Sequence, residues 1–293
     1  MKNVRKRRFG DRRDGRRLRS LDPYNALTPY IMKQKNESDN SFSGKVEITE
    51  VERYLRRKRI AGSPGIGMLH LFVAAFIRVI SQYPGVNRYV VGQRVYARTK
   101  IEVIMTVKKA MMISAGETSI KVEFDPGDTI NEVYQRINSE VDKIKNEGEE
   151  TSTDAAAKML MKMPRLILKF AVFCLTVMDY FGKLPKSLVK ASPFHGTMVI
   201  TDLGSIGLPT MAHHLYNFGD TPLFMAFGTK RRENELARDG TVAERKYIDY
   251  TMVLDERICD GFYFSQGYRY FNSLLRDPQQ LETAPETVVE DVD

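Results

Sequence analysis

The sequence predicts an α/β domain, and two observations support this. Segments with the alternating or β-branched pattern of strands are separated by segments with helical periodicity. The 293 residues are 42% hydrophobic and 28% charged, which is typical of a soluble globular protein with a sizeable core. The length suits one large domain or two small ones. The predicted strands are residues 94–98, 100–108, 120–124, 196–203, 223–229 and 246–254.

Four further segments predict helices. Residues 50–59 follow Thr49, which could cap them, with Glu52 at capping-box distance. Residues 68–83 are apolar almost all round and predict a buried helix, in which His70 is expected to be packed rather than to bind a ligand. Residues 128–145 and 262–275 are amphipathic.

The two ends of the chain carry opposite charge. Residues 1–20 form a basic arm, with ten Lys/Arg between positions 2 and 19, and residues 283–293 form an acidic tail. We expect residues 1–44 to be irregular and extended, and to end in a strand near residues 44–48. Such an arm can bind nucleic acid or an acidic membrane. Because no folded nucleic-acid motif follows it, we favour a solvated arm, or one docked on an acidic neighbouring subunit.

Composition argues against several classes of protein. The two cysteines, Cys174 and Cys259, are too few for a disulfide framework and fit a reducing cytoplasm, and no zinc-ligand spacing is present. We therefore predict a cytoplasmic protein without a metal. No signal peptide is expected, since no apolar stretch follows the basic N-terminus. The longest apolar run, residues 166–181, is interrupted by Lys169 and Asp179, so a membrane span is not expected.

The segment of residues 151–192 stands apart because it is apolar and helical. One polar stripe runs along it, and three interpretations stay open. In the first interpretation the helix packs against the sheet or a neighbouring subunit. In the second it lies on a membrane surface through residues 166–181, and in the third it lines a channel for a long acyl chain. The stripe consists of Lys158, Lys162, Arg165, Lys169, Thr176, Asp179 and Lys183.

Three motifs carry a resemblance to a known family. Residues 255–261 read D-E-R-I-C-D-G, residues 196–207 read G-T-M-V-I-T-D-L-G-S-I-G, and residues 83–87 read Y-P-G-V-N. The first resembles the H-R-x-x-D-G signature of dihydrolipoyl acyltransferase catalytic domains and the H-x-x-C-D-G of chloramphenicol acetyltransferases. The second is similar to G-T-F-T-I-[ST]-N-L-G-x-x-G, and the third to H-P-x-L-N. Together they resemble the catalytic domain of the 2-oxo acid dehydrogenase acyltransferases.

This resemblance implies a chloramphenicol-acetyltransferase-like fold, a mixed sheet covered by helices, assembled as a homotrimer or a larger cage. It covers residues 21–282, with residues 151–192 as an insertion, and no lipoyl domain has a counterpart in this chain. The implied ligand is coenzyme A or acyl-CoA as substrate. The implied partners are further copies of the chain and a dehydrogenase-complex or lipoyl-type protein.

The resemblance also assigns roles to residues. In the family a histidine removes the proton from a thiol, and a Ser/Thr hydroxyl donates to the oxyanion of the tetrahedral intermediate. By position, Thr201 matches this hydroxyl and Glu256 matches the histidine. Arg257, Asp260 and Gly261 match the structural part of the motif, in which the aspartate fixes the loop through an ion pair.

The glutamate leaves the activity open. A free glutamate carboxyl has a pKa of about 4.3 and a thiol has a pKa of about 8.5, so an unshifted carboxylate is a poor base for a thiol. Burial would make Glu256 a better base, and an ion pair with Arg257 would make it a worse one. His195, His213 and His214 could supply a replacement imidazole. The leading hypothesis is a coenzyme A-dependent acyltransferase or acyl-CoA-binding relative, and the alternative is an inactive, self-assembling scaffold.

Overall fold

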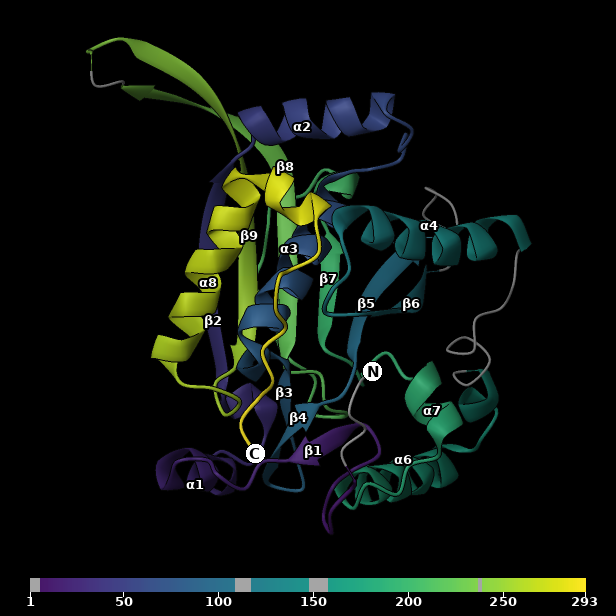
Figure 1. Ribbon diagram of the computed structural model, residues 1–293. Helices are drawn as coiled ribbons and strands as arrows, with labels where there is room; N and C mark the ends of the chain where they lie inside the picture. Colours follow the sequence, from purple (N-terminus) through teal and green to yellow (C-terminus); the bar gives the residue numbers. More distant parts are fainter. Residues whose placement is uncertain (1–5, 109–116, 148–157, 237–238) are drawn as a thin grey trace.

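A six-stranded mixed sheet forms the centre of the molecule (Figure 1). The computed structural model describes residues 6–108, 117–147, 158–236 and 239–293. β7 runs parallel to its neighbours β5 and β8, and the other pairs are antiparallel. This confirms the predicted α/β class with a mixed sheet. The strand order is β2 (Asp39–Glu47), β9 (Val242–Asp255), β8 (Leu223–Leu236), β7 (Met198–Asp202), β5 (Ile101–Lys108) and β6 (Glu117–Phe124).

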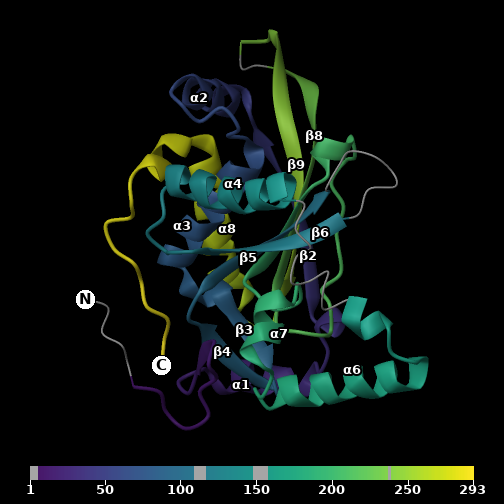
Figure 2. The same cartoon turned by 90° about the vertical axis from the view of Figure 1, so that its right-hand side faces the viewer.

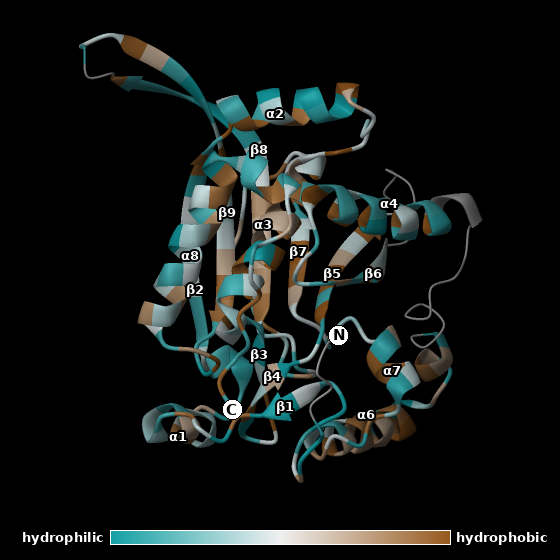
Figure 3. Cartoon of the chain, viewed as in Figure 1, coloured by the Kyte–Doolittle hydropathy of each residue, from teal (hydrophilic) through white to brown (hydrophobic). Residues whose placement is uncertain are grey.

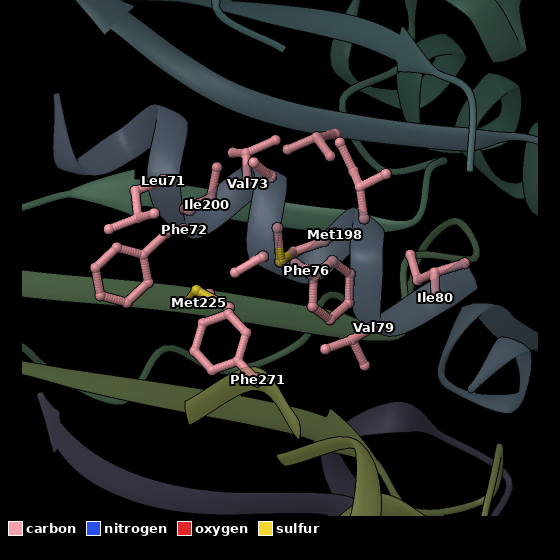
Figure 4. Packing of buried hydrophobic residues seen from close by; sticks show 14 of the residues in the cluster. Leu71, Phe72, Val73, Phe76, Val79, Ile80, Met198, Ile200, Met225 and Phe271 are labelled. Atoms are coloured by element: carbon pink, nitrogen blue, oxygen red, sulfur yellow. The ribbon is translucent and has the colours of Figure 1, made fainter. Parts of the chain in front are cut away.

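Helices cover one face of this sheet. α3 (Met68–Gln82) and α8 (Gly261–Arg276) lie side by side on it, with α4 (Ile130–Glu147) near β6 and α2 (Thr49–Ile60) across one end (Figures 1 and 2). Phe72 of α3 stacks on Phe227 of β8 with 4.8 Å between ring centroids, and it also meets Tyr250 and Phe271. Figure 4 shows side chains of α3 gathered with Met198, Ile200 and Met225 of the strands and with Phe271 of α8. α3 is the buried helix that its composition predicts.

The central strands divide their side chains between the two faces. Met198 and Ile200 of β7 belong to the core under the helices. Val199, between them, belongs to a second cluster with Ile104, Leu215, Phe224 and Val253. Since side chains alternate along a strand, Thr201 has the same orientation as Val199 and lies on the face that these helices leave uncovered.

The expectation that residues 1–44 are irregular is wrong. β1 (Gly15–Arg17) joins β4 (Arg94–Arg98) and β3 (Arg88–Val91) in a second sheet, α1 (Pro23–Ile31) follows, and β2 already begins at Asp39. The Asp22–Pro23 pair starts a helix, because the Asp22 carboxylate accepts from the Tyr24 amide at 2.9 Å and proline suits the first helical position.

Two other boundaries differ from those predicted. Thr49 does not cap α2, because it is the first helical residue and Ile48 occupies the cap position. β8 and β9 continue as a hairpin that projects from the sheet (Figure 1). In this projecting hairpin, charged side chains in contact with solvent take the place of the alternating apolar residues that usually mark a strand. They form cross-strand ion pairs such as Arg232–Glu244, 3.1 Å, and Arg245–Glu235, 3.3 Å.

The acidic tail docks on the basic arm of the same chain. Asp291 forms a buried ion pair with Arg88, and Asp293 pairs with Arg8 at 2.9 Å and with Arg16 at 3.3 Å. The backbone amide of Arg19 also donates to the Asp293 carbonyl at 3.0 Å. The basic arm therefore has its acidic partner within its own chain.

Short 3-10 turns occur at Lys35–Glu37, Pro84–Asn87, Gly204–Ile206 and Pro278–Glu282.

The apolar segment lies at the base of the molecule. Its described part contains α6 (Arg165–Tyr180) and α7 (Lys186–Ala191), and residues 151–157 are outside the described ranges. Figure 3 shows apolar residues along α6. The predicted polar stripe is interrupted, because Asp179 is buried against Arg12, with 3.0 Å between carboxylate and guanidinium. Among the described helices, none has the length and apolar content required to cross a bilayer.

His70 is packed, as predicted. It is buried, its Nδ1 accepts from the Gly67 amide at 3.1 Å, and burial lowers its pKa to about 4. The unfolded chain therefore takes up the proton at higher pH than the folded one. His70 should cost stability as the pH falls from about 6.5 toward 4, by up to about 3 kcal/mol.

We predict that His70→Gln flattens this part of the stability profile. Urea titrations between pH 7 and pH 4 should show a smaller loss of unfolding free energy in the variant than in the wild type. Equal slopes for wild type and His70→Gln would contradict the assignment.

Candidate functional site

A buried ion pair fixes the turn that carries Glu256. The Arg257 guanidinium binds Asp255 with two hydrogen bonds of 2.7 Å, and both side chains are buried. Ser38 donates to the same carboxylate at 3.0 Å, and Arg257 donates to the Met32 carbonyl at 3.0 Å. The partner of Arg257 is therefore Asp255 rather than Glu256, and the turn is attached to the segment before β2.

Glu256 itself faces outward. Its backbone amide donates to the Ser38 carbonyl at 2.9 Å, while its side chain is exposed. The Asn40 amide donates to its carboxylate at 2.5 Å. Within one chain, the carboxylate is held at the surface by a neutral neighbour.

The rest of the motif shapes the start of α8. Asp260 is the N-cap, its carboxylate accepts from the Tyr263 amide at 2.8 Å, and Gly261 begins the helix. The ion pair that the described residues form in this turn joins Asp255 and Arg257, at its other end. Burial raises the pKa of Cys259 to about 12, so its thiol stays protonated at neutral pH and is no nucleophile.

Thr201 lies near the end of β7 on the second face of the sheet. It stands in one row with Ala226 of β8 and Thr251 of β9. Its side chain is partly exposed, and no hydrogen-bond partner of its hydroxyl is found in the part of the chain that the structure describes. The hydroxyl is therefore available to a ligand or to another copy.

One chain does not bring Thr201 and Glu256 together. Glu256 follows β9, five residues beyond the row of Thr201. At about 3.4 Å per extended residue, the five residues correspond to a separation of about 17 Å along the strands. If they serve one reaction, each must complete its site with a residue of another chain.

The three candidate histidines occupy different environments. His195 is buried, with Nδ1 2.8 Å from the Ser192 hydroxyl and Nε2 3.4 Å from the Asp179 carboxylate. His213 stacks on Phe224 with 4.1 Å between ring centroids, and His214 stacks on His213. Phe224 pairs with Val199, which has the same orientation as Thr201 on β7. His213 therefore lies on the same face of the sheet as Thr201, displaced along the strands toward the end that carries Glu256.

The third motif is structural. Asn87 is buried and donates to the Lys100 carbonyl at 3.0 Å, and the Gly85 amide donates to the Tyr263 hydroxyl at 2.9 Å. These bonds attach the turn after α3 to the start of α8 and to the strand region before β5.

A cavity of about 690 Å³ opens between β5, β6 and α7. Its wall includes Ile104, which pairs with Val199 on the Thr201 face. Lys121 lies within it, donates to the Val189 carbonyl at 2.8 Å and has its pKa lowered by burial. Lys186 and Lys190 also line the cavity. It is large enough for a small organic ligand, and its wall carries charges of both signs, since Asp14, Glu102, Glu123 and Glu140 also line it.

No protein-family model matches the chain, and no curated protein matches its sequence. Solved structures do match its fold. A probable dihydrolipoamide acetyltransferase from Listeria monocytogenes 4b F2365 has a TM-score of 0.56 at 14% identity, covering 88% of this chain and 94% of that one. The cubic core of a pyruvate dehydrogenase multienzyme complex gives 0.52 at 14% identity, covering 88% of each. A chloramphenicol acetyltransferase gives 0.51 at 12% identity, covering 88% of this chain and 99% of that one.

The chain has the fold of these acyltransferases. This confirms the resemblance on which the site residues were chosen, at the level of the fold. Among the described residues, no group of three or more His, Cys, Asp or Glu side chains is arranged to hold a metal ion.

Sequence reasoning missed the residues that support the turn. Asp255 and Glu256 both precede Arg257 closely in the motif, so the sequence offered two carboxylates as its partner and no signal to choose between them. Ser38 lies 217 positions away from Asp255 and gave no such signal.

We predict that Arg257→Leu destabilises the fold by about 3–5 kcal/mol, because it leaves the Asp255 carboxylate buried without its cation. The comparison is Arg232→Leu, whose pair with Glu244 is exposed on the hairpin and should be worth about 0–1 kcal/mol. Urea denaturation at equal protein concentration measures both variants. Similar losses for the two would show that the Asp255–Arg257 pair does not fix the turn.

Proposed function

We propose that this chain is a coenzyme A-dependent acyltransferase of the chloramphenicol-acetyltransferase type, with its reaction centre formed between two copies. The observation that carries the proposal is the placement of the two motif residues. Thr201 lies on a sheet face that α3 and α8 leave uncovered, and Glu256 is presented outward on a rigid turn. Each is accessible, and neither can reach the other within a chain.

In this proposal the reaction transfers an acyl group from coenzyme A to an acceptor thiol. The acceptor thiolate attacks the thioester carbonyl, a tetrahedral intermediate forms, and the thiolate of coenzyme A leaves with the electron pair of the broken C–S bond. The Thr201 hydroxyl donates to the oxyanion, an interaction worth roughly 3 kcal/mol in comparable sites. Glu256 of a second copy occupies the position of the base that accepts the thiol proton and returns it to the leaving thiolate.

The comparisons support a second part of the proposal, self-association, because one solved structure with this fold is the cubic core of a multienzyme complex. We predict a trimer, or a multiple of three, each trimer having three times the chain mass of 33.6 kDa. Mass photometry at nanomolar concentration, with analytical ultracentrifugation at micromolar concentration, measures this. Only monomers or dimers at both concentrations would remove the shared reaction centre.

We predict that Glu256→His raises acyl transfer from acetyl-CoA to a dithiol acceptor at pH 7 by about 10²–10⁴-fold. An imidazole, which titrates near about 6.5, is better matched to a thiol than an ordinary carboxylate. Adding Thr201→Val should remove most of the gain, because valine keeps the shape and deletes the hydroxyl. Fast transfer by the wild type that Glu256→His slows would instead show that Glu256 is already an effective base.

Two controls separate the alternatives. His213→Gln should leave the activity of Glu256→His unchanged, and a large loss would identify His213 as the base. Co-refolding Glu256→Ala with the double variant Glu256→His/Thr201→Val should produce activity that neither has alone, because the histidine of one chain then meets the threonine of another. Calorimetric titration with acetyl-CoA and longer acyl-CoAs tests binding itself. Absence of binding in every form would support the inactive scaffold.

A further inference from the structure

α6 exposes a continuous row of large apolar side chains. The row follows helical spacing of three and four, and at 3.6 residues per turn its members fall within an arc of about 80°. We call it the apolar ridge. It consists of Leu166 (80% exposed), Phe170 (67%), Phe173 (63%), Val177 (39%) and the C-cap residue Phe181 (67%).

The apolar ridge is not the side of α6 that packs on the molecule. The helix is attached at its C-terminal end, where Arg12 donates to the Asp179 carbonyl at 2.7 Å and pairs with its carboxylate. The Tyr180 hydroxyl also meets the Gln93 side chain at 3.1 Å. The partly buried residues Ala171, Leu175 and Met178 lie on another side of the helix from the ridge. Figures 1 and 2 show α6 at the base, apart from the main sheet.

Positive charge accompanies the apolar ridge. Residues 158–190 contain seven Lys/Arg and one acidic residue, so their net charge is +6, and that acidic residue is Asp179, which is paired with Arg12. Arg165 and Lys169 are exposed on α6 beside the ridge, and Lys162 precedes the helix. Lys186 and Lys190 follow on α7.

These charges decide between two occupants of the ridge. A second copy docked ridge to ridge would bring two segments of net charge +6 together, which is unfavourable. An anionic bilayer attracts the cations and accepts the apolar side chains at its interface. At about 1.5 Å per residue the 16 residues of α6 span about 24 Å, less than a hydrocarbon core of about 30 Å, so the helix suits the plane of the interface.

We propose that the apolar ridge of α6 binds the surface of anionic lipid bilayers, with its phenylalanines among the acyl chains and the flanking lysines and arginines on the lipid head groups. This interaction is independent of acyl transfer. It gives the segment of residues 151–192 a role that the acyltransferase fold does not require. The protein would be a peripheral membrane protein whose α6 lies parallel to the bilayer.

The sequence contains no tryptophan, which allows a direct test. Phe173→Trp places a single indole on the apolar ridge, and its emission should shift to the blue with vesicles of 70% phosphatidylcholine and 30% phosphatidylglycerol. Pure phosphatidylcholine vesicles should give a smaller shift, and 1 M salt should weaken binding. The matched control is Ile60→Trp, at an exposed residue that also follows a run of cations, at the end of α2. Its emission should not change.

Co-sedimentation with the same vesicles provides the second measurement. Phe170→Ser/Phe173→Ser should lower the partition coefficient at least tenfold, Lys162→Glu/Lys169→Glu should lower it on anionic vesicles, and Ile60→Ser should not. Thermal melting confirms that the variants are folded. The proposal is overturned if wild type stays in the supernatant, or if the serine variant binds as wild type does. It is also overturned if the serine variant loses its oligomeric state without lipid, since the ridge would then be a contact between copies.

Discussion

The alternation of side chains along β7, β8 and β9 is the constraint on which the molecule depends. Met198, Ile200 and Met225 must face α3 and α8, because the core of the domain is built on that side. The side chains of their neighbours Val199, Thr201 and Phe224 must then point to the second face of the sheet. A slip of one residue in β7 would bury the Thr201 hydroxyl under α3 and expose Ile200. Core packing and placement of the candidate hydroxyl are thus a single requirement.

The same register explains why Thr201 and Glu256 lie apart within one chain. Thr201 belongs to the row of Ala226 and Thr251, while Glu256 can only follow the end of β9. No local rearrangement closes a gap of several strand residues. The Asp255–Arg257 pair makes the turn still less adaptable, because both charges are buried and depend on each other. A rigid turn of this kind is suited to presenting a side chain to a neighbouring molecule.

The sequence predicted those features that local patterns determine. An apolar run with helical length gave α3, and the motif of residues 196–207 located β7 and Thr201. The features it missed depend on distant partners or on solvent. The hairpin of β8 and β9 is stabilised by ion pairs such as Arg232–Glu244 and has no buried face that would reveal it. The partner of Arg257 could not be chosen between Asp255 and Glu256 from sequence, because that choice depends on Ser38 and on burial. His213 reached the Thr201 face through stacking on Phe224, which no spacing indicates.

Arg12 gives the basic arm a mechanical role. The charge pattern of its segment predicts a solvated basic arm, but the Arg12 guanidinium forms ion pairs with Asp179 of α6 and with Asp14. Arg16 of the same arm pairs with Asp293 of the tail. One end of α6 is therefore anchored by a residue that precedes it by 167 positions. Removing the first twenty residues would release this anchor and the tail as well as the charge. A truncated chain would differ from the whole one in shape, and any loss of binding it showed would report a lost scaffold as readily as a lost contact.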